Sequence, residues 1–163
     1  MRKYRLTDEK IIVGCRTLYR IQALRDFGDV KEGDIGGYIE AEKNLIQDGN
    51  AWVYDDARVS GNAWVSDNAR VYGNARVYGN AQVSGDADIE NKSDICSMSG
   101  FGSALRTTTA FKTKDGAIHV TCGCFYGNLD DFYNRVEETH GDTLYGREYK
   151  KMIELIKIHF GIE

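Results

Sequence analysis

The sequence predicts a mainly β protein whose central part is a solenoid of stacked coils. Three observations support this prediction. Between Gly49 and Cys96 a unit of six residues recurs as GNAWVY, DDARVS, GNAWVS, DNARVY, GNARVY, GNAQVS, GDADIE and NKSDIC. The chain of 163 residues contains 18 glycines and no proline, so tight turns are abundant while the composition is unlike that of a disordered linker. This length supports one main core with a small additional unit.

Each hexad places a small residue two positions before a β-branched residue. The small residues are Ala51, Ala57, Ala63, Ala69, Ala75, Ala81, Ala87 and Ser93, and the β-branched residues are Val53, Val59, Val65, Val71, Val77, Val83, Ile89 and Ile95. Alternation along a strand directs both to one face. The Gly, Asn and Asp residues between these pairs tolerate the backbone angles of sharp corners. Coils that bend the same way at each corner therefore bury columns of Ala and Val around one axis.

The hexads resemble those of the hexapeptide-repeat family, whose fold is the left-handed parallel β-helix. The segment Val53-Tyr54-Asp55-Asp56-Ala57-Arg58 fits the family pattern at its first and fifth positions, but Tyr or Ser replaces the usual Gly or Ala at the second. The resemblance implies a three-sided solenoid with three hexads, or 18 residues, per coil, and a homotrimer. The motif Tyr-Gly-Asn-Ala-Arg-Val also resembles the repeats of small β-helix proteins encoded by phages and prophages.

Residues 1–30 predict an N-terminal β-hairpin that caps the first coil. Apolar stretches at Tyr4–Leu6 and Leu18–Leu24 flank a turn at Val13-Gly14. A cap is expected because the uncovered end of a solenoid is an open sheet edge. Ile39 and Leu45 hold the phase of the alanines upstream of Gly49, so we expect a further, imperfect coil and place the β-helix at residues 31–100.

Residues 101–163 predict a ββαα unit. The stretches Leu105–Lys112 and Ile118–Phe125 flank an Asp-Gly pair, which indicates a hairpin. Asn128 is a helix N-cap, and an amphipathic helix follows from Leu129 to His140. A second helix with one apolar face runs from Leu144 to Phe160.

Composition and charge exclude several kinds of partner. The net charge is −4 and no segment is basic enough to bind duplex DNA. No apolar run has the length of a membrane helix, and no secretory leader follows the basic N-terminus. We read the four cysteines, Cys15, Cys96, Cys122 and Cys124, as reduced thiols. We therefore expect a cytoplasmic protein, located in the host cell cytoplasm if phage-encoded.

The histidines argue against catalysis. Hexapeptide-repeat acyltransferases commonly use a histidine as general base, and the family's metal-dependent carbonic anhydrases use three histidines on the coils. Here His119, His140 and His159 all lie outside the repeat. We therefore expect no enzymatic activity, no catalytic residue and no cofactor.

The spacing His119-x-x-Cys122-x-Cys124 is a candidate zinc site. On a strand, however, His119 faces away from the two cysteines, and a fourth ligand is not obvious. We expect no metal, with the thiols packing as small apolar groups. The glycine-rich segments 33–37 and 100–102 lack the Lys-Ser/Thr pair of a phosphate-binding loop, so we interpret them as turns.

The outward faces of the coils carry the candidate binding residues. The residue between Ala and Val in each hexad points outward, and the coil length stacks these residues as Trp52–Arg70–Asp88, Arg58–Arg76–Asp94 and Trp64–Gln82. Trp, Tyr and Arg are typical of interaction hot spots, and an Arg beside a Tyr offers a phosphate-binding fork next to a stacking ring. The candidates are Arg58, Arg70, Arg76, Tyr72, Tyr78, Trp52, Trp64 and Arg106. Alternatively, the arginines pair with acidic side chains of a neighbouring subunit.

These features together predict a non-enzymatic β-solenoid binding protein. Its expected partner is a host protein or a small anionic, nucleotide-like ligand. The phage-like repeat suggests a counter-defence role, in which the protein inhibits a host protein or sequesters a nucleotide signal. Two alternatives stay open, a relative of the acyltransferases and a structural component of the virion.

Overall fold

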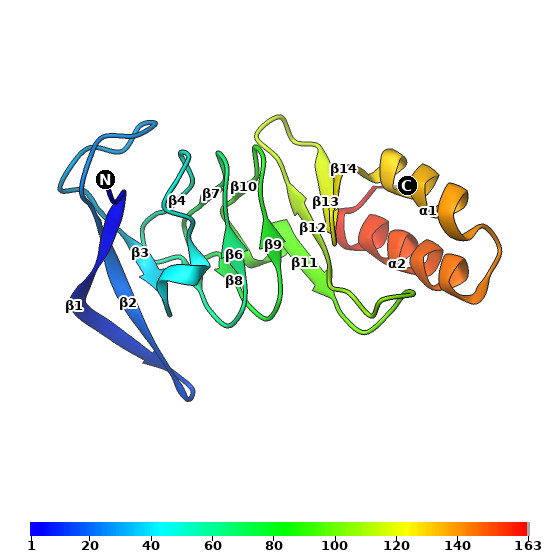
Figure 1. Ribbon diagram of the computed structural model, residues 1–163, viewed down its shortest axis with the longest axis horizontal. Helices are drawn as coiled ribbons and strands as arrows, with labels where there is room; N and C mark the ends of the chain where they lie inside the picture. Colours follow the sequence, from blue (N-terminus) through cyan, green and yellow to red (C-terminus); the bar gives the residue numbers. More distant parts are fainter. Residues whose placement is uncertain (163) are drawn as a thin grey trace.

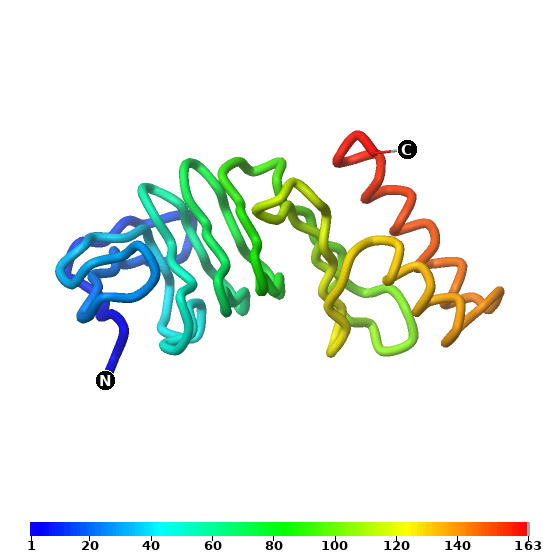
Figure 2. Tube along the Cα trace, turned by 90° about the horizontal axis from the view of Figure 1, so that it is seen from above, coloured from blue at the N-terminus to red at the C-terminus, as the bar shows by residue number. Residues whose placement is uncertain are grey.

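The computed structural model describes residues 1–162. An N-terminal β-hairpin, a stack of coils and a C-terminal sheet carrying two helices follow one another along the long axis of the molecule (Figure 1). Seen from above, the coils form a regular stack between the N-terminal and C-terminal segments (Figure 2). The chain is mainly β, with short parallel strands in the repeat region.

The coils are built from strands of two residues each. These are β4 (Trp52–Val53), β5 (Arg58–Val59), β6 (Trp64–Val65), β7 (Arg70–Val71), β8 (Arg76–Val77), β9 (Gln82–Val83) and β10 (Asp88–Ile89). They pair in parallel as three stacks, β3-β5-β8 with β3 at Ile35–Ile39, β4-β7-β10, and β6-β9. Val53 pairs with Val71, 18 positions later, which confirms the coil length that the family resemblance implies. The left-handed sense of the coil stays a prediction.

The two inward columns form the core of the coils. Every Ala from Ala51 to Ala87 and every β-branched residue from Val53 to Ile89 in the repeat is at most 2% exposed. Most corners reach the left-handed backbone angles that they need with glycine, whereas Asp67 does so with φ 59° and Asp55 with φ 53°. The Asp55 carboxylate accepts a hydrogen bond from the Gly73 N–H (3.2 Å) of the next coil, which ties the two corners together.

The N-terminal segment forms the hairpin that the sequence predicts. Strand β1 (Tyr4–Val13) pairs antiparallel with β2 (Arg16–Ala23), and β2 pairs antiparallel with β3. Tyr38 of β3 pairs with Arg58, 20 positions later, so the first coil is two residues longer than the others. The predicted alanine phase of Ile39 and Leu45 is therefore wrong, because they pair with Val59 and Val65 in the valine column. The hairpin thus extends one stack of the solenoid into a five-stranded sheet, β1-β2-β3-β5-β8.

The C-terminal unit has two more strands than the predicted ββαα arrangement. Strands β11 (Ile95–Met98), β12 (Thr108–Lys112), β13 (Ile118–Cys122) and β14 (Phe125–Asn128) form one antiparallel sheet in that order. The prediction was wrong because it placed the residues of β11 in the last coil and those of β14 in the connection that leads to the first helix.

Both helices have the predicted bounds, α1 (Leu129–His140) and α2 (Leu144–Phe160). The Asn128 side chain caps α1 by accepting a hydrogen bond from the Asp131 N–H (2.8 Å). Buried residues of both helices pack against β12 and β13 as a second core. Neither helix in the described range combines the length and hydrophobicity that crossing a membrane requires.

The eighth hexad departs from the predicted pattern. Ser93, expected in the inward column, is exposed, while Asp94, expected on the surface, is 7% exposed. A short 3₁₀ helix, η2 (Lys92–Asp94), replaces the corner because the Asp94 carboxylate accepts hydrogen bonds from the N–H groups of Glu90 (3.1 Å) and Asn91 (2.8 Å). The predicted stack Arg58–Arg76–Asp94 is therefore wrong at Asp94, and the regular coils end there.

Candidate functional site

Trp52 does not lie on the surface. It points away from the coil axis as predicted, but the N-terminal segment covers it and leaves it 1% exposed. Its ring packs edge-on against Tyr4 and Phe27, with centroid distances of 6.1 and 5.2 Å. The expectation of an exposed Trp52 was wrong because a sequence repeat does not indicate which face the cap covers.

Arg70 is held by groups of its own chain. Its Nη2 lies 3.8 Å from the Asp29 carboxylate, and its guanidinium lies 5.3 and 5.6 Å from the ring centroids of Tyr54 and Tyr72. The Tyr54 hydroxyl donates to the same carboxylate (2.8 Å). Burial, followed by that hydrogen bond, raises the pKa of Tyr54 to about 12. Arg70 and Tyr72 therefore belong to a packed ionic cluster on the β4-β7-β10 face.

Two other candidates lie on separate surfaces. Trp64, 38% exposed, stands beside Gln82 on the β6-β9 face. Arg106 lines a small hollow of about 140 Å³ in the C-terminal unit, together with Cys122 and Tyr149. Neither residue contributes to the cavity described next.

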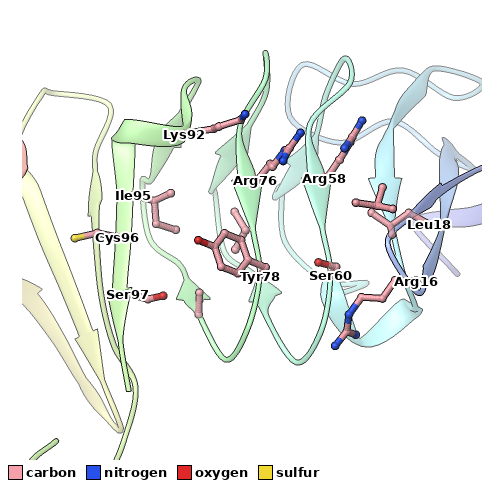
Figure 3. Close-up of a pocket in the computed structure, with 13 residues that line it drawn as sticks. Arg16, Leu18, Arg58, Ser60, Arg76, Tyr78, Lys92, Ile95, Cys96 and Ser97 are labelled. Atoms are coloured by element: carbon pink, nitrogen blue, oxygen red, sulfur yellow. The ribbon is translucent and has the colours of Figure 1, made fainter. Parts of the chain in front are cut away.

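Four cationic side chains line one cavity of about 370 Å³, which we call the β8 groove. Its lining consists of Val13, Arg16, Leu18, Arg58, Ser60, Arg76, Val77, Tyr78, Ala81, Lys92, Ile95, Cys96 and Ser97. Figure 3 shows β5 and β8 as the floor, with Arg16 and Leu18 of β2 at one end and the β11 residues at the other. Three of the predicted residues, Arg58, Arg76 and Tyr78, come together here.

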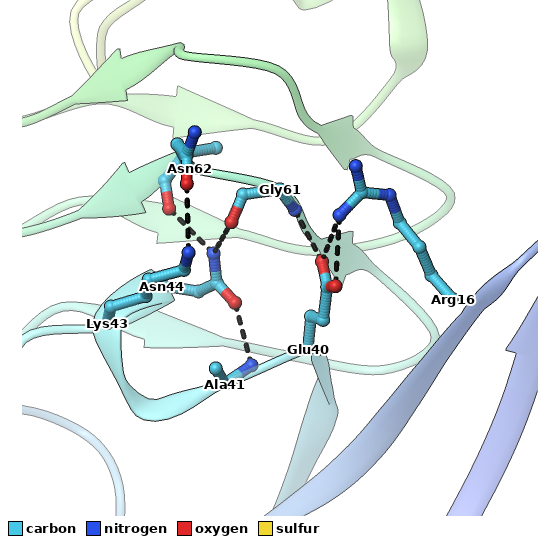
Figure 4. Close-up of polar contacts among 8 residues, drawn as sticks. Arg16, Glu40, Ala41, Lys43, Asn44, Gly61 and Asn62 are labelled. Atoms are coloured by element: carbon cyan, nitrogen blue, oxygen red, sulfur yellow. Dashed lines mark hydrogen bonds and ion pairs between the residues drawn. The ribbon is translucent and has the colours of Figure 1, made fainter.

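The cations of the β8 groove are unequally neutralised. Arg16 forms an ion pair with Glu40 (2.8 Å), whose carboxylate also accepts from the Gly61 N–H (2.7 Å) (Figure 4). The backbone hydrogen bond, followed by Arg16, lowers the pKa of Glu40. Within residues 1–162, no carboxylate pairs with Arg58, Arg76 or Lys92. The groove therefore carries net positive charge and contains no acidic residue in its lining.

The floor of the groove is an unpaired strand edge. In the repeat, alternate N–H groups donate to the next coil, as Arg58 N does to Ala75 O (3.1 Å) and Ser60 N to Val77 O (2.9 Å). The same geometry directs the N–H groups of Arg76 and Tyr78 toward the groove. Among the hydrogen bonds of residues 1–162, neither N–H has a partner. Two backbone donors therefore add to the cations.

The departure of the eighth hexad explains this open edge. By the register of the coils, Arg76 N would donate to Ser93 O, and Tyr78 N to Ile95 O. The Ser93 carbonyl instead contacts His159 Nε2 (2.9 Å), and Ile95 belongs to β11, which pairs with β12. Helix α2 and the C-terminal sheet thus hold these acceptors away from β8.

The other two stacks are covered at their C-terminal ends. Gln82 N of β9 donates to Thr109 Oγ1 (3.1 Å), and Thr121 Oγ1 donates to Gln82 O (2.8 Å). Beside β10, Lys114 N donates to Asp86 O (2.9 Å). The C-terminal unit therefore supplies hydrogen bonds to the edges next to β9 and β10.

The N-terminal ends are covered as well. The Asn44 side chain donates to Gly61 O (3.1 Å) and Ala63 O (2.8 Å), next to β6 (Figure 4). The Lys3 ammonium donates to Ala51 O (2.9 Å), next to β4, and β2 pairs with β3. On the C-terminal side of the coils, β8 thus differs from β9 and β10, because within residues 1–162 no hydrogen bond from the C-terminal unit reaches its edge.

The residues of the candidate zinc site have other partners. His119 Nδ1 lies 2.9 Å from the Tyr126 hydroxyl, and the buried Cys122 Sγ accepts a hydrogen bond from Thr108 Oγ1 (3.4 Å). Cys124 is exposed. Over residues 1–162, no cluster of three or more His, Cys, Asp or Glu side chains has the arrangement of a metal site.

Sequence reasoning missed Arg16 and Lys92. Arg16 enters the groove because β2 extends the solenoid sheet, and Lys92 enters because η2 replaces a corner. The one feature of the sequence that could have indicated the position of Lys92 is the irregular eighth hexad, NKSDIC.

Comparison with known proteins finds similarity in the repeat region and does not extend over the whole chain. Residues 51–67 and 69–85 match the family described as "YdcK Beta solenoid repeat". A segment of 68 residues is 38% identical to the "Uncharacterized acetyltransferase YdcK" of Escherichia coli (strain K12), covering 37% of this chain and 21% of that protein. The chain thus spans about a fifth of the length of this curated relative. The solenoid nature of the repeat is established by this match, whereas the likeness to phage proteins stays a prediction.

Proposed function

We propose that the chain is a binding protein whose β8 groove captures a small ligand carrying phosphate groups and an aromatic ring, as nucleotides do. The observation that carries the proposal is the convergence of Arg58, Arg76 and Lys92, all without acidic partners, on one cavity beside Tyr78. Phosphate oxygens accept paired hydrogen bonds from the planar guanidinium of Arg. The ring of Tyr78, 65% exposed, supplies a surface on which a base stacks.

The open edge of β8 strengthens this proposal. Backbone N–H groups that point the same way form favourable sites for anions, because they add partial positive charge without the flexibility of a side chain. The N–H groups of Arg76 and Tyr78 are such donors. The cavity volume of about 370 Å³ lies within the roughly 300–1,000 Å³ typical of small-molecule sites.

The proposal is tested by calorimetric titration with inorganic pyrophosphate and with ATP. Arg58→Ala and Arg76→Ala should each weaken binding about tenfold or more, because each removes a charge-assisted contact. Arg70→Ala is the matched control, since this arginine has the same place in its hexad but lies on another face beside Asp29. Absence of binding by the wild type, or equal weakening by Arg70→Ala, would contradict the proposal.

The printed name of the relative favours a second candidate, acetyl transfer. Acetyl-CoA is a phosphate-bearing nucleotide, so the cationic groove suits this donor as well. The lining of the groove contains no His, which is the most frequent general base, and no Asp or Glu; its proton-accepting side chains are those of Tyr78, Lys92 and Cys96. Incubation with acetyl-CoA and amine acceptors, followed by mass spectrometry, separates the two candidates, since a binder retains the intact donor.

The biological setting is proposed from the sequence alone. We propose a cytoplasmic, left-handed solenoid that assembles as a homotrimer and sequesters a nucleotide signal or inhibits a host protein, in the manner of a phage counter-defence protein. Native mass spectrometry of the protein from infected cells measures the mass of the assembly and of any retained ligand. A fixed copy number in purified virions would instead favour the structural alternative.

A further inference from the structure

Helix α2 carries an apolar stripe that nothing in residues 1–162 covers. One side of the helix is buried against the C-terminal sheet through Tyr149, Met152, Ile153 and Ile156. On another side, Leu144 is 61% exposed, Leu155 is 53% exposed and Ile158 is 76% exposed. Large aliphatic residues at this exposure are costly in water when they gather on one face.

The stripe has the spacing of a helix-packing seam. Positions 144, 148, 151, 155 and 158 alternate by four and three residues, which places them on one face of the helix. The middle positions are charged, Glu148 and Lys151, with leucines on either side. Phe101, 46% exposed, and Met98 extend the apolar surface beside Leu144 and Leu155.

We propose that this stripe binds α2 of a second copy of the chain in an antiparallel, two-fold arrangement. Around a two-fold axis between positions 149 and 150, Leu144 faces Leu155 of the second copy. The same axis places Glu148 opposite Lys151 of the second copy. Because the pairing is reciprocal, two apolar contacts and two ion pairs form at once, as an isologous interface requires.

The charges select this orientation. A parallel pairing would place Glu148 against Glu148 and Lys151 against Lys151 of the second copy, which is repulsive. The alternating spacing defines two sets of positions on this face, 144, 151 and 158 in one and 148 and 155 in the other. In an antiparallel helix pair, a position of one set lies opposite a position of the other set, as in the pairs 144–155 and 148–151.

Existing contacts leave both charges available. One carboxylate oxygen of Glu148 accepts from the Gly102 N–H (2.6 Å), and the other oxygen is free to meet a lysine. Lys151 pairs with Glu154 (3.1 Å) on the exposed surface, where such pairs contribute little. In Figure 1, α2 lies at the end of the molecule away from the hairpin.

Sedimentation equilibrium over a range of concentrations tests the proposal. The mass of the wild type should double, from monomer to dimer, or from trimer to hexamer if the coils also trimerise. Leu155→Glu should raise the dissociation constant of this step about tenfold or more. Ile12→Glu is the control, because Ile12 is an equally aliphatic and 75% exposed residue on the hairpin. A wild-type mass that never doubles would overturn the proposal.

Charge exchange tests the register itself. Glu148→Lys alone and Lys151→Glu alone should each abolish self-association, because each creates like charges across the axis. An equimolar mixture of the two variants should associate again, because the lysines of one meet the glutamates of the other. Melting temperatures of both variants guard against misfolding caused by loss of the Gly102 contact. Failure of two folded variants to associate when mixed would contradict the antiparallel register.

Discussion

At strand β9 the C-terminal sheet supplies two threonines to the last coil, whereas at strand β8 no group within residues 1–162 makes such a contact. Gln82 of β9 is bonded through both its N–H and its carbonyl. The N–H groups of Arg76 and Tyr78 beside β8 have no such partners among residues 1–162. Proteins normally cover or blunt their sheet edges, so an edge left open within a cationic cavity supports the ligand site that we propose.

The largest loss of stability is expected in the interior of the coils, where the buried columns are the same on all three faces. Val71→Asp should unfold the protein, because Val71 is fully buried and an unpaired charge there costs about 4 kcal/mol or more. Tyr78→Asp, on the open face, should keep the fold. Thermal unfolding followed by circular dichroism measures both. A folded Val71→Asp protein with an unchanged melting temperature would mean that the inward phase is wrong.

A smaller effect is expected at the covered edge of β9. Thr109→Val keeps the shape of a fully buried side chain but removes the acceptor for Gln82 N. The unsatisfied N–H should lower the free energy of unfolding by about 1–3 kcal/mol. Ser60→Ala, in the β8 groove, should change it by less than about 0.5 kcal/mol. Equal losses in a urea titration would remove the difference between the two edges.

Lys3, which covers the edge of β4, should make the free energy of unfolding depend on pH. Burial, with help from Arg25, lowers the pKa of Lys3 to about 8. The folded protein therefore loses this proton before the unfolded chain does, so the free energy of unfolding should rise between pH 8 and about 9.5, by about 1–2 kcal/mol. Burial also raises the pKa of Tyr4, which lowers stability once the pH exceeds about 10.

Lys3→Met is the control for this pH dependence. The variant should be less stable overall, because Ala51 O loses its donor, and its stability should not rise with pH. Urea titrations at several pH values give both quantities. A rise of the same size in Lys3→Met would assign the effect to another group.

The smallest change in stability is expected at the open edge itself. Arg76→Ala removes an exposed side chain without an ionic partner, so the free energy of unfolding should change by less than about 0.5 kcal/mol. Arg70→Ala should cost more, because its guanidinium contacts Asp29, Tyr54 and Tyr72. A larger loss for Arg76→Ala would indicate a structural role and weaken its assignment to binding.

The comparison of the coil faces also shows which features of the fold can be predicted from the sequence. The period of six predicts the inward columns, and the resemblance to the hexapeptide-repeat family implies the coil length and with it the stacking of Arg58 on Arg76. The helix bounds were equally accessible, since Asn128 and Thr143 are typical capping residues.

The candidate site was predicted in part, because it depends on contacts between distant segments. Nothing local distinguishes Trp52, which the hairpin buries, from Trp64, which stays exposed, although both precede Val in identical Gly-Asn-Ala-Trp-Val segments. Likewise, Arg70 and Arg76 have the same place in their hexads, but Asp29 reaches Arg70 alone. The open edge arises from His159 and β12, both remote from β8 in the sequence.

Amide chemical shifts during titration with pyrophosphate test the open edge most directly. In two-dimensional ¹H–¹⁵N spectra, the amide signals of Arg76 and Tyr78 should move first and furthest, because their N–H groups are the free backbone donors of the groove. The amide signals of Gln82 and Arg70, whose N–H groups already donate to Thr109 and Ala87, should stay in place. Unmoved signals from Arg76 and Tyr78, or shifts of equal size at Gln82 and Arg70, would contradict the assignment of the β8 groove as the binding site.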